Sequence, residues 1–172
     1  MEFERLFKEH KNLVYNLALQ YCQNTEDAEE ITQDVFFKVY QKLHSFKNEA
    51  NIKTWIYRIC INTSLDFIKS KYALRRGLNL QKNRTSEIPF QNQNFNHPGA
   101  ELEQKEGLKR LFQAINQLPE NQKTVIILLK IEQNSSKETA EIMETSTKAV
   151  ESLFQRAKTN LAKILLQQKD HE

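Results

Sequence analysis

The sequence predicts an all-α protein made of two small helical domains joined by a flexible linker. Apolar residues recur at three- and four-residue steps through both halves of the 172-residue chain, which is the spacing of amphipathic helices. Two of the three Gly and two of the three Pro lie between Gly77 and Gly99, so helix-breaking residues are rare elsewhere. About 25 residues around this stretch lack helical periodicity, which would be unusual inside one compact domain.

Three helices are expected in the first half of the chain. The first spans about 2–21, and Asn24 or Thr25 would cap the second, whose first turns are acidic because acids suit the positive end of a helix dipole. A loop at 45–51 separates it from a third helix, which spans about 52–71. The inner face of that third helix is expected to consist of Trp55, Ile56, Ile59, Cys60, Thr63 and Phe67.

The second half begins again after a linker at 74–101, within which residues 91–96 read QNQNFN. One helix ends near Leu118, and Pro119 suits the first position of the next, where its missing N–H is not needed. Ser135 and Glu138 then have the spacing of a capping box, in which each side chain accepts a backbone N–H. The expected domains are therefore 1–73 and 102–172.

The final two helices have the spacing of a helix-turn-helix. A short helix ends near Met143, a tight turn follows at 144–146, and a long helix runs to about residue 168. Ala140 is small enough for a close helix crossing, and Val150, ten residues later, can fill the crossing from the second helix. In a helix-turn-helix that second helix enters the DNA major groove. Two ordinary packed helices would show the same spacing.

Charge is distributed unevenly and favours nucleic-acid binding. Between residues 53 and 84 there are eight basic residues and one acid, with Trp55 and Tyr57 interleaved, a composition that suits single-stranded nucleic acid. A lone Trp at helical spacing with Ile59 is usually a core residue, so Trp55 suits the core better, whereas Tyr57 and Arg58 are expected on the solvent face. The last helix, 147–169, carries five basic residues and one acid, and the second helix is acidic enough to dock a basic protein.

Several classes of protein are disfavoured. No apolar run approaches the ~20 residues that cross a bilayer, so direct membrane insertion is not expected and a cytoplasmic protein fits best. Cys22 and Cys60 stand alone, the four His are scattered, and no Gly-rich phosphate loop is present. We therefore expect no metal, no cofactor and no enzymatic activity.

Four stretches of the sequence resemble the extracytoplasmic-function sigma factors of the sigma-70 family. In the first half they are DAEEITQDVFFKVYQKL at 27–43 and TWIYRICINTSLDF at 54–67. In the second half they are LPENQKTVIILL at 118–129 and AEIMETSTKAVESLFQRAKTNL at 140–161. The resemblance implies a sigma2-like helical bundle, a linker and a sigma4-like helix-turn-helix, with core RNA polymerase, promoter DNA and an anti-sigma factor as partners.

The resemblance also implies roles for individual residues. The polymerase-binding surface would contain Asp27, Glu30, Gln33 and Asp34. The surface for −10 recognition and melting, next to a base-capturing loop at 46–51, would contain Lys53, Trp55, Tyr57, Arg58, Asn62 and Lys69. The surface for −35 recognition would contain Lys148, Glu151, Ser152, Gln155, Arg156 and Lys158.

Some positions depart from the usual family pattern. Gln133 and Asn134 stand where a Gly-Leu pair is common, Thr139 replaces an aliphatic residue, and Glu144 occupies a turn position where Gly is frequent. A non-Gly residue in a left-handed turn costs roughly 1 kcal/mol, so the turn is expected to persist. Two other functions suit the residues: a free-standing helix-turn-helix regulator, and a helical adaptor whose charges only keep it in solution.

Overall fold

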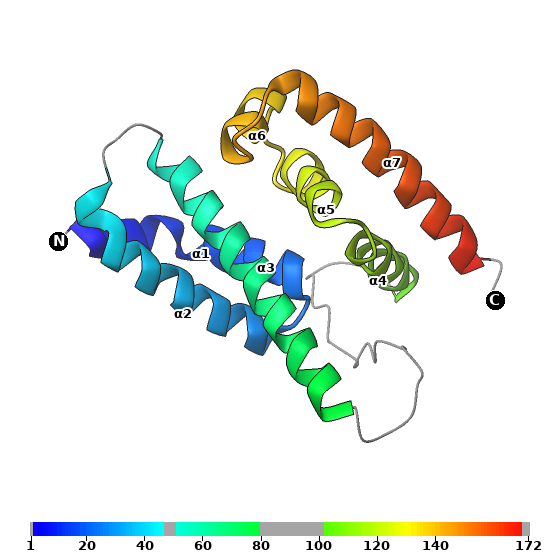
Figure 1. Cartoon of the computed structure of the whole chain (residues 1–172), viewed down its shortest axis with the longest axis horizontal. Helices are drawn as coiled ribbons and strands as arrows, with labels where there is room; N and C mark the ends of the chain where they lie inside the picture. The colour runs from blue at the N-terminus through cyan, green and yellow to red at the C-terminus, as the bar shows by residue number, and fades with distance from the viewer. Residues whose placement is uncertain (1, 47–50, 80–101, 170–172) are drawn as a thin grey trace. The chain divides into compact units, whose positions relative to one another are not determined.

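The computed structural model describes residues 2–46, 51–79 and 102–169, and its backbone divides into two compact helical units. The first unit holds α1 (Glu2–Cys22), α2 (Thr25–Lys42), a 3-10 turn η1 (Leu43–Ser45) and α3 (Ile52–Asn79). The second holds α4 (Leu102–Asn116), α5 (Glu120–Ile126), a π-helical turn η2 (Ile127–Ile131), α6 (Ser136–Ile142) and α7 (Thr147–Lys169). No strand occurs in the described ranges, so the all-α, two-domain expectation is confirmed (Figure 1).

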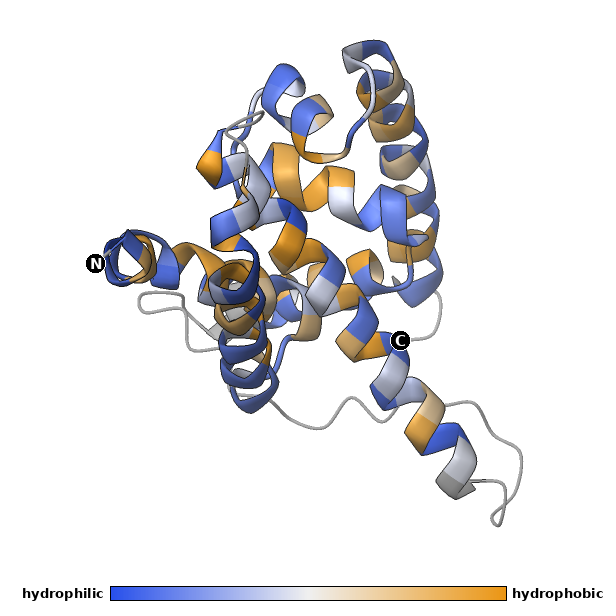
Figure 2. Ribbon diagram, turned by 60° about the vertical axis from the view of Figure 1, so that its left-hand side comes forward, coloured by the Kyte–Doolittle hydropathy of each residue, from blue (hydrophilic) through white to orange (hydrophobic). Residues whose placement is uncertain are grey.

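The first unit is a bundle in which each of its three helices contacts the other two. Asn24 caps α2 as expected, its side-chain oxygen accepting the Asp27 backbone N–H at 2.8 Å. The core consists of residues from the inward side of each helix, and Figure 2 shows apolar and polar residues sharing each helix in this way. Its fully buried members include Val14, Leu17, Tyr21, Ile31, Val35, Val39, Ile56 and Cys60.

Helix α3 is longer than the sequence predicts. Its expected end near residue 71 is wrong, because the helix continues to Asn79. The apolar spacing that marks a helix stops where the bundle stops, and residues 72–77 are exposed to solvent. The predicted linker at 74–101 therefore begins with helix, and its residues 80–101 lie outside the described part of the chain.

The second unit is built around α7, which contacts α4, α5 and α6. Phe112, Ile115, Val125, Ala140, Val150 and Ala157 belong to one buried cluster. Pro119 differs slightly from expectation, because it is the N-cap of α5 and Glu120 is the first helical residue. The π-helical turn η2 was also not predicted, and it leads directly into the turn that precedes α6.

Candidate nucleic-acid and protein interfaces

The exposed side of α2 is acidic over its first half. Glu26, Glu29, Glu30, Gln33 and Asp34 are all exposed, because they lie opposite the buried residues of the same helix. A helix turns by about 100° per residue, so Glu30 and Gln33 share one face and Asp34 lies at its edge. This arrangement gives the first unit an anionic surface that a basic protein could bind.

Asp27 does not belong to that surface. Its backbone N–H is held by the Asn24 cap, and its carboxylate accepts a hydrogen bond from the Lys71 ammonium group of α3. The side chain of Asp27 is only 15% exposed. Asp27 therefore joins the start of α2 to α3, and it presents little charge to a partner.

Exposed aromatic residues continue the same face of α2 toward its C-terminal end. Phe37 is 61% and Tyr40 64% exposed, although large apolar side chains are usually buried. The Tyr40 ring packs edge-on against Phe3 of α1, with ring centres 5.3 Å apart. Phe37 and Tyr40 have no role in the prediction from sequence. Two aromatics three residues apart, off the buried stripe of α2, are nevertheless a usable signal of an exposed aromatic face.

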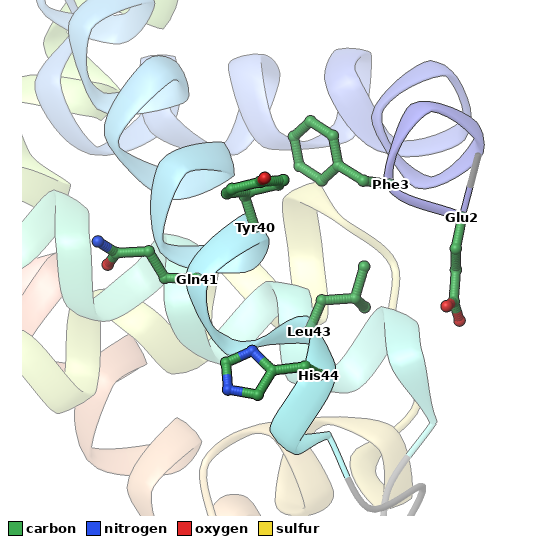
Figure 3. Close-up of a pocket in the computed structure, with 6 residues that line it drawn as sticks. All are labelled: Glu2, Phe3, Tyr40, Gln41, Leu43 and His44. Atoms are coloured by element: carbon green, nitrogen blue, oxygen red, sulfur yellow. The ribbon is translucent and has the colours of Figure 1, made fainter.

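A shallow pocket lies beside Tyr40, where the end of α2 meets the start of α1. It has a volume of about 470 Å³ and is lined by Glu2, Phe3, Tyr40, Gln41, Leu43 and His44. Figure 3 shows the Phe3 and Tyr40 rings side by side, with Leu43 and His44 following on the next turn. A partner side chain could therefore be seated against aromatic surface here.

One face of α3 brings together several of the residues predicted for the −10 surface. Arg58, Asn62 and Lys69 lie within about 40° of one another around the helix, and Asn62 and Lys69 are exposed while Arg58 is half-buried. Trp55 lies on the same side, half-buried, with its ring 4.8 Å from that of Phe46. Phe46 and Asn51 are the first and last residues of the predicted base-capturing loop, whose residues 47–50 lie outside the described ranges.

The structure places Lys53 and Tyr57 elsewhere on α3. Tyr57 is only 2% exposed, so the expectation that it faces solvent is wrong. Because α3 packs against both α1 and α2, its buried sector is wider than one stripe and includes Tyr57 and Ile61 beside Ile56 and Cys60. The Lys53 ammonium group lies 5.8 Å from the centre of the Tyr57 ring, on the side of α3 turned away from Arg58.

His10 of α1 lies near this end of α3. Burial lowers the pKa of His10 below its usual 6.5, the Glu9 carboxylate raises it, and the nearby Lys53 ammonium lowers it. The net lowering means that folding favours the neutral imidazole.

Helices α6 and α7 form the predicted helix-turn-helix. The capping box is present, since the Ser135 side chain accepts the Glu138 N–H and the Glu138 carboxylate accepts the Ser135 N–H. Ala140 and Val150 are both buried in the same cluster at the crossing of the two helices. Glu144 adopts a φ of 54°, so the turn persists without Gly, as expected.

The outer face of α7 carries the residues predicted to read DNA. Lys148, Ser152 and Gln155 lie within about 60° of one another, Glu151 and Arg156 flank them, and all five are exposed. The side chain of Ser146 accepts the Ala149 N–H at 3.1 Å and so caps the end of α7 that would enter a groove. Hydroxyl, amide and ammonium groups on one helix face can reach both base edges and phosphates.

Lys158 is exposed but turns toward a different neighbour. Its ammonium group lies 4.9 Å from the centre of the Phe154 ring, and that of Lys130, from η2, lies 5.2 Å from the same ring. Phe154 thus holds two cations at the edge of the α7 face. Lys158 is therefore better placed for a phosphate than for a base edge.

No candidate metal centre is found in the part of the chain that the structure describes. The described ranges contain no group of three His, Cys, Asp or Glu side chains placed to hold a metal ion. None of their helices combines the length and apolar character needed to span a bilayer. The exposed faces described above are the candidate interfaces: an acidic and aromatic face on α2 and basic faces on α3 and α7.

Two family models match the chain in the same order as these surfaces. Residues 6–73 match sigma-70 region 2, and residues 108–161 match sigma-70 region 4. The chain belongs to the sigma-70 family. As an extracytoplasmic-function sigma factor it binds core RNA polymerase and directs promoter recognition, with region 2 in the first helical unit and region 4 in the second.

Curated relatives agree along almost the whole chain. It is 31% identical to the RNA polymerase sigma factor SigV of Bacillus subtilis, covering 94% of this chain and 89% of the relative. It is 28% identical to the ECF sigma factor SigW of the same organism, covering 91% and 84%. The family accounts for both halves of the sequence, whereas a free-standing regulator would leave the region 2 match without a role, so that alternative is not favoured.

Solved structures show the same fold. The sigma factor RpoE from Bartonella quintana, crystallised with the anti-sigma factor NepR, matches with a TM-score of 0.66 and 20% identity, covering 95% of this chain and 96% of that one. CnrH, in complex with the cytosolic domain of CnrY, matches with a TM-score of 0.64 and 21% identity, covering 95% and 86%.

Proposed function

We propose that the exposed face of α2 is the polymerase-docking face of this sigma factor, and we define it as Glu30, Gln33, Asp34, Phe37 and Tyr40. The order of chemistry along α2 carries this proposal: acids and an amide come first, and two exposed aromatics follow on the same side. Acids would steer a basic polymerase surface, and the aromatics would supply the apolar area that holds it. Asp27 is left out because its charge is engaged by Lys71.

The DNA contacts are divided between the two units. Arg58, Asn62 and Lys69 of α3, with Trp55 beside them, face the −10 element and stabilise its separated strands. Cations there would balance phosphates, and an aromatic ring offers a surface on which an unstacked base can pack. Tyr57 does not touch bases because it is buried, and Lys53 does not because it lies on the side of α3 turned away from Arg58.

In the second unit, the outer face of α7 reads the −35 element as duplex. Lys148, Ser152 and Gln155 lie toward the groove, with Glu151 and Arg156 beside them and Lys158 toward a phosphate. Each unit alone offers a small interface. Tight binding therefore depends on the polymerase holding both units at the spacing of the two promoter elements.

The wider proposal concerns domains, partners and location. Region 2 function is assigned to 1–73 and region 4 function to 102–172, with 74–101 as the connection that begins as the end of α3. Sigma factors are initiation factors rather than catalysts, and we propose that this chain has no enzymatic activity of its own and acts in the cytoplasm. Since the sigma factor RpoE of Bartonella quintana, which has this fold, has been solved with the anti-sigma factor NepR, an anti-sigma factor is proposed here too.

The docking face is tested with the double variant Phe37→Ala/Tyr40→Ala. Each truncated aromatic should cost the complex with core polymerase on the order of 1–2 kcal/mol, so the affinity of the pair should fall about 30-fold or more. Titration of labelled core polymerase with the full chain measures this. Tyr72→Ala, an exposed aromatic on α3, is the control and should bind core normally.

Both replaced side chains are exposed, so the bundle should stay folded in the double variant, and the emission of the single tryptophan, Trp55, checks this. A folded Phe37→Ala/Tyr40→Ala variant that binds core with unchanged affinity would remove the docking face from α2.

A further inference from the structure

The last two turns of α3 extend beyond the bundle. Lys71 pairs with Asp27 in the first turn of α2, so the residues after Lys71 lie past the level at which α1 ends and α2 begins. Figure 1 shows the end of α3 continuing past both neighbouring helices. Residues 72–77 are all exposed, including Tyr72 at 41% and Leu74 at 68%. We call residues 72–77 the α3 extension.

The α3 extension is strongly basic. Between residues 67 and 79, α3 carries four basic residues, Lys69, Lys71, Arg75 and Arg76, and no acid. Lys71 is neutralised by Asp27, whereas Arg75 and Arg76 have no ion-pair partner among the described residues. Two adjacent guanidinium groups on an unpacked helix gain nothing for the fold, since like charges repel. A ligand that supplies negative charge would relieve this repulsion.

The extension continues the promoter-facing side of α3. At about 100° per residue, Arg76 falls in line with Arg58, Asn62 and Lys69 on one side of the helix. Arg75 lies about 100° away from Arg76 around the helix, and both side chains are exposed, so the two can contact phosphates on either side of that line. With a rise of 1.5 Å per residue, Arg76 lies about 27 Å from Arg58, the length of roughly eight base pairs of duplex. A DNA strand that meets Arg58 and Lys69 can therefore continue toward Arg76.

The root of the extension is fixed, which limits where it can point. The ion pair between Asp27 and Lys71 and the hydrogen bond from the Lys38 ammonium to the Thr63 hydroxyl, at 3.0 Å, both tie α2 to α3. A basic helix held at a set angle loses little conformational freedom on binding.

The apolar residues of the extension do not suit a protein partner. Leu74 continues the core side of α3, whereas Tyr72 lies about 160° away around the helix. They form no contiguous apolar patch, and the surface between them is basic. The positive charge of the α3 extension thus favours a polyanion as its partner over the apolar groove of a protein.

We propose that the α3 extension binds the phosphate backbone of double-stranded DNA without reading its sequence, with Arg75 and Arg76 as the main contacts. This goes beyond the −10 residues and rests on the proposed promoter face of α3. In the assembled complex, the contact would fall on the duplex next to the separated strands. It would add affinity and salt dependence and leave promoter choice unchanged.

The test uses the full chain and a 30-base-pair duplex of arbitrary sequence, with about 50 mM salt as the starting point for a titration. In Arg75→Ala/Arg76→Ala the binding constant should fall several-fold, and the slope of log K against log salt should decrease by about 2, since each phosphate contact contributes about 0.9. Arg75→Lys/Arg76→Lys should keep the slope. Alanine favours helix, so circular dichroism should remain unchanged.

Arg5→Ala/Lys8→Ala on α1 is the charge-matched control, and both of its residues are exposed. The proposal is wrong if the slope of log K against log salt decreases as much in the control as in the arginine variant. It is also wrong if the arginine variant binds the duplex with the slope and affinity of the wild type. Loss of core-polymerase affinity in the arginine variant, with duplex binding intact, would reassign the extension to the polymerase. The duplex assay needs no polymerase, so it tests the α3 extension alone. Failure of the proposed sigma function would instead be seen as a loss of promoter-specific transcription.

Discussion

Individual residues show where sequence reasoning succeeds and where it stops. The roles of Ser135, Glu138, Ala140 and Val150 follow from short-range chemistry, since caps and helix crossings depend on residues only a few positions apart. The exposure of Tyr57 was predicted wrongly, because it depends on how many helices pack around α3, which spacing within one helix does not reveal. The pairing of Asp27 with Lys71, 44 residues away, was out of reach for the same reason.

Gln133 offers a test at the residue scale. It adopts a φ of 56° in the turn between η2 and α6, a conformation that costs a non-Gly residue roughly 1 kcal/mol. Gln133→Gly should therefore raise the stability of the second unit by about 0.5 kcal/mol after the extra freedom of Gly in the unfolded chain is subtracted. Urea unfolding followed by circular dichroism measures the change.

The matched control is Gln155→Gly, in the middle of α7, which should lower stability by about 1 kcal/mol. Trp55 lies in the first unit, so its emission should report an unchanged transition in both variants. A Gln133→Gly variant that is less stable than the wild type would show that this turn does not store backbone strain.

At the scale of elements, helix positions were predicted closely wherever an apolar stripe and a cap coincide. Helices α1, α2, α6 and α7 match their predicted ranges within one or two residues. Helix α3 was predicted too short, because its extension lacks the apolar spacing that signals burial. The π-helical turn η2 was missed because nothing in ILLKI distinguishes one extra backbone residue from a regular helical turn.

The crossing of α6 and α7 gives a test at this scale. Ala140→Leu should overpack the crossing against Val150 and destabilise the second unit by about 1–3 kcal/mol. It should also weaken −35-dependent transcription, because α7 would be displaced from its angle to α6. Ala162→Leu, on the exposed side of α7, is the control and should change stability by less than about 0.5 kcal/mol. Equal stability of the two variants would mean that the crossing tolerates a large residue.

At the scale of the whole molecule, the region 2 unit and the region 4 unit supply complementary surfaces of one initiation factor. An acidic and aromatic face on α2 suits a protein, and basic faces on α3 and α7 suit nucleic acid, so the chain can connect a polymerase to DNA. The sequence predicted this division from charge and resemblance, and both family matches confirm the identity. Phe37 and Tyr40 lie off the apolar stripe of α2, which is a signal in the sequence, but the extent of their exposure depends on what α1 and α3 leave uncovered.

The most direct test of the central claim is promoter-specific transcription. The purified chain would be mixed with sigma-free core polymerase from its own source and fragments of the same genome, and the transcript starts would be mapped. We expect discrete starts that share two upstream elements at a fixed spacing, lost in the Phe37→Ala/Tyr40→Ala variant. An absence of discrete starts, together with failure of the chain to bind core polymerase, would contradict its function as a sigma factor.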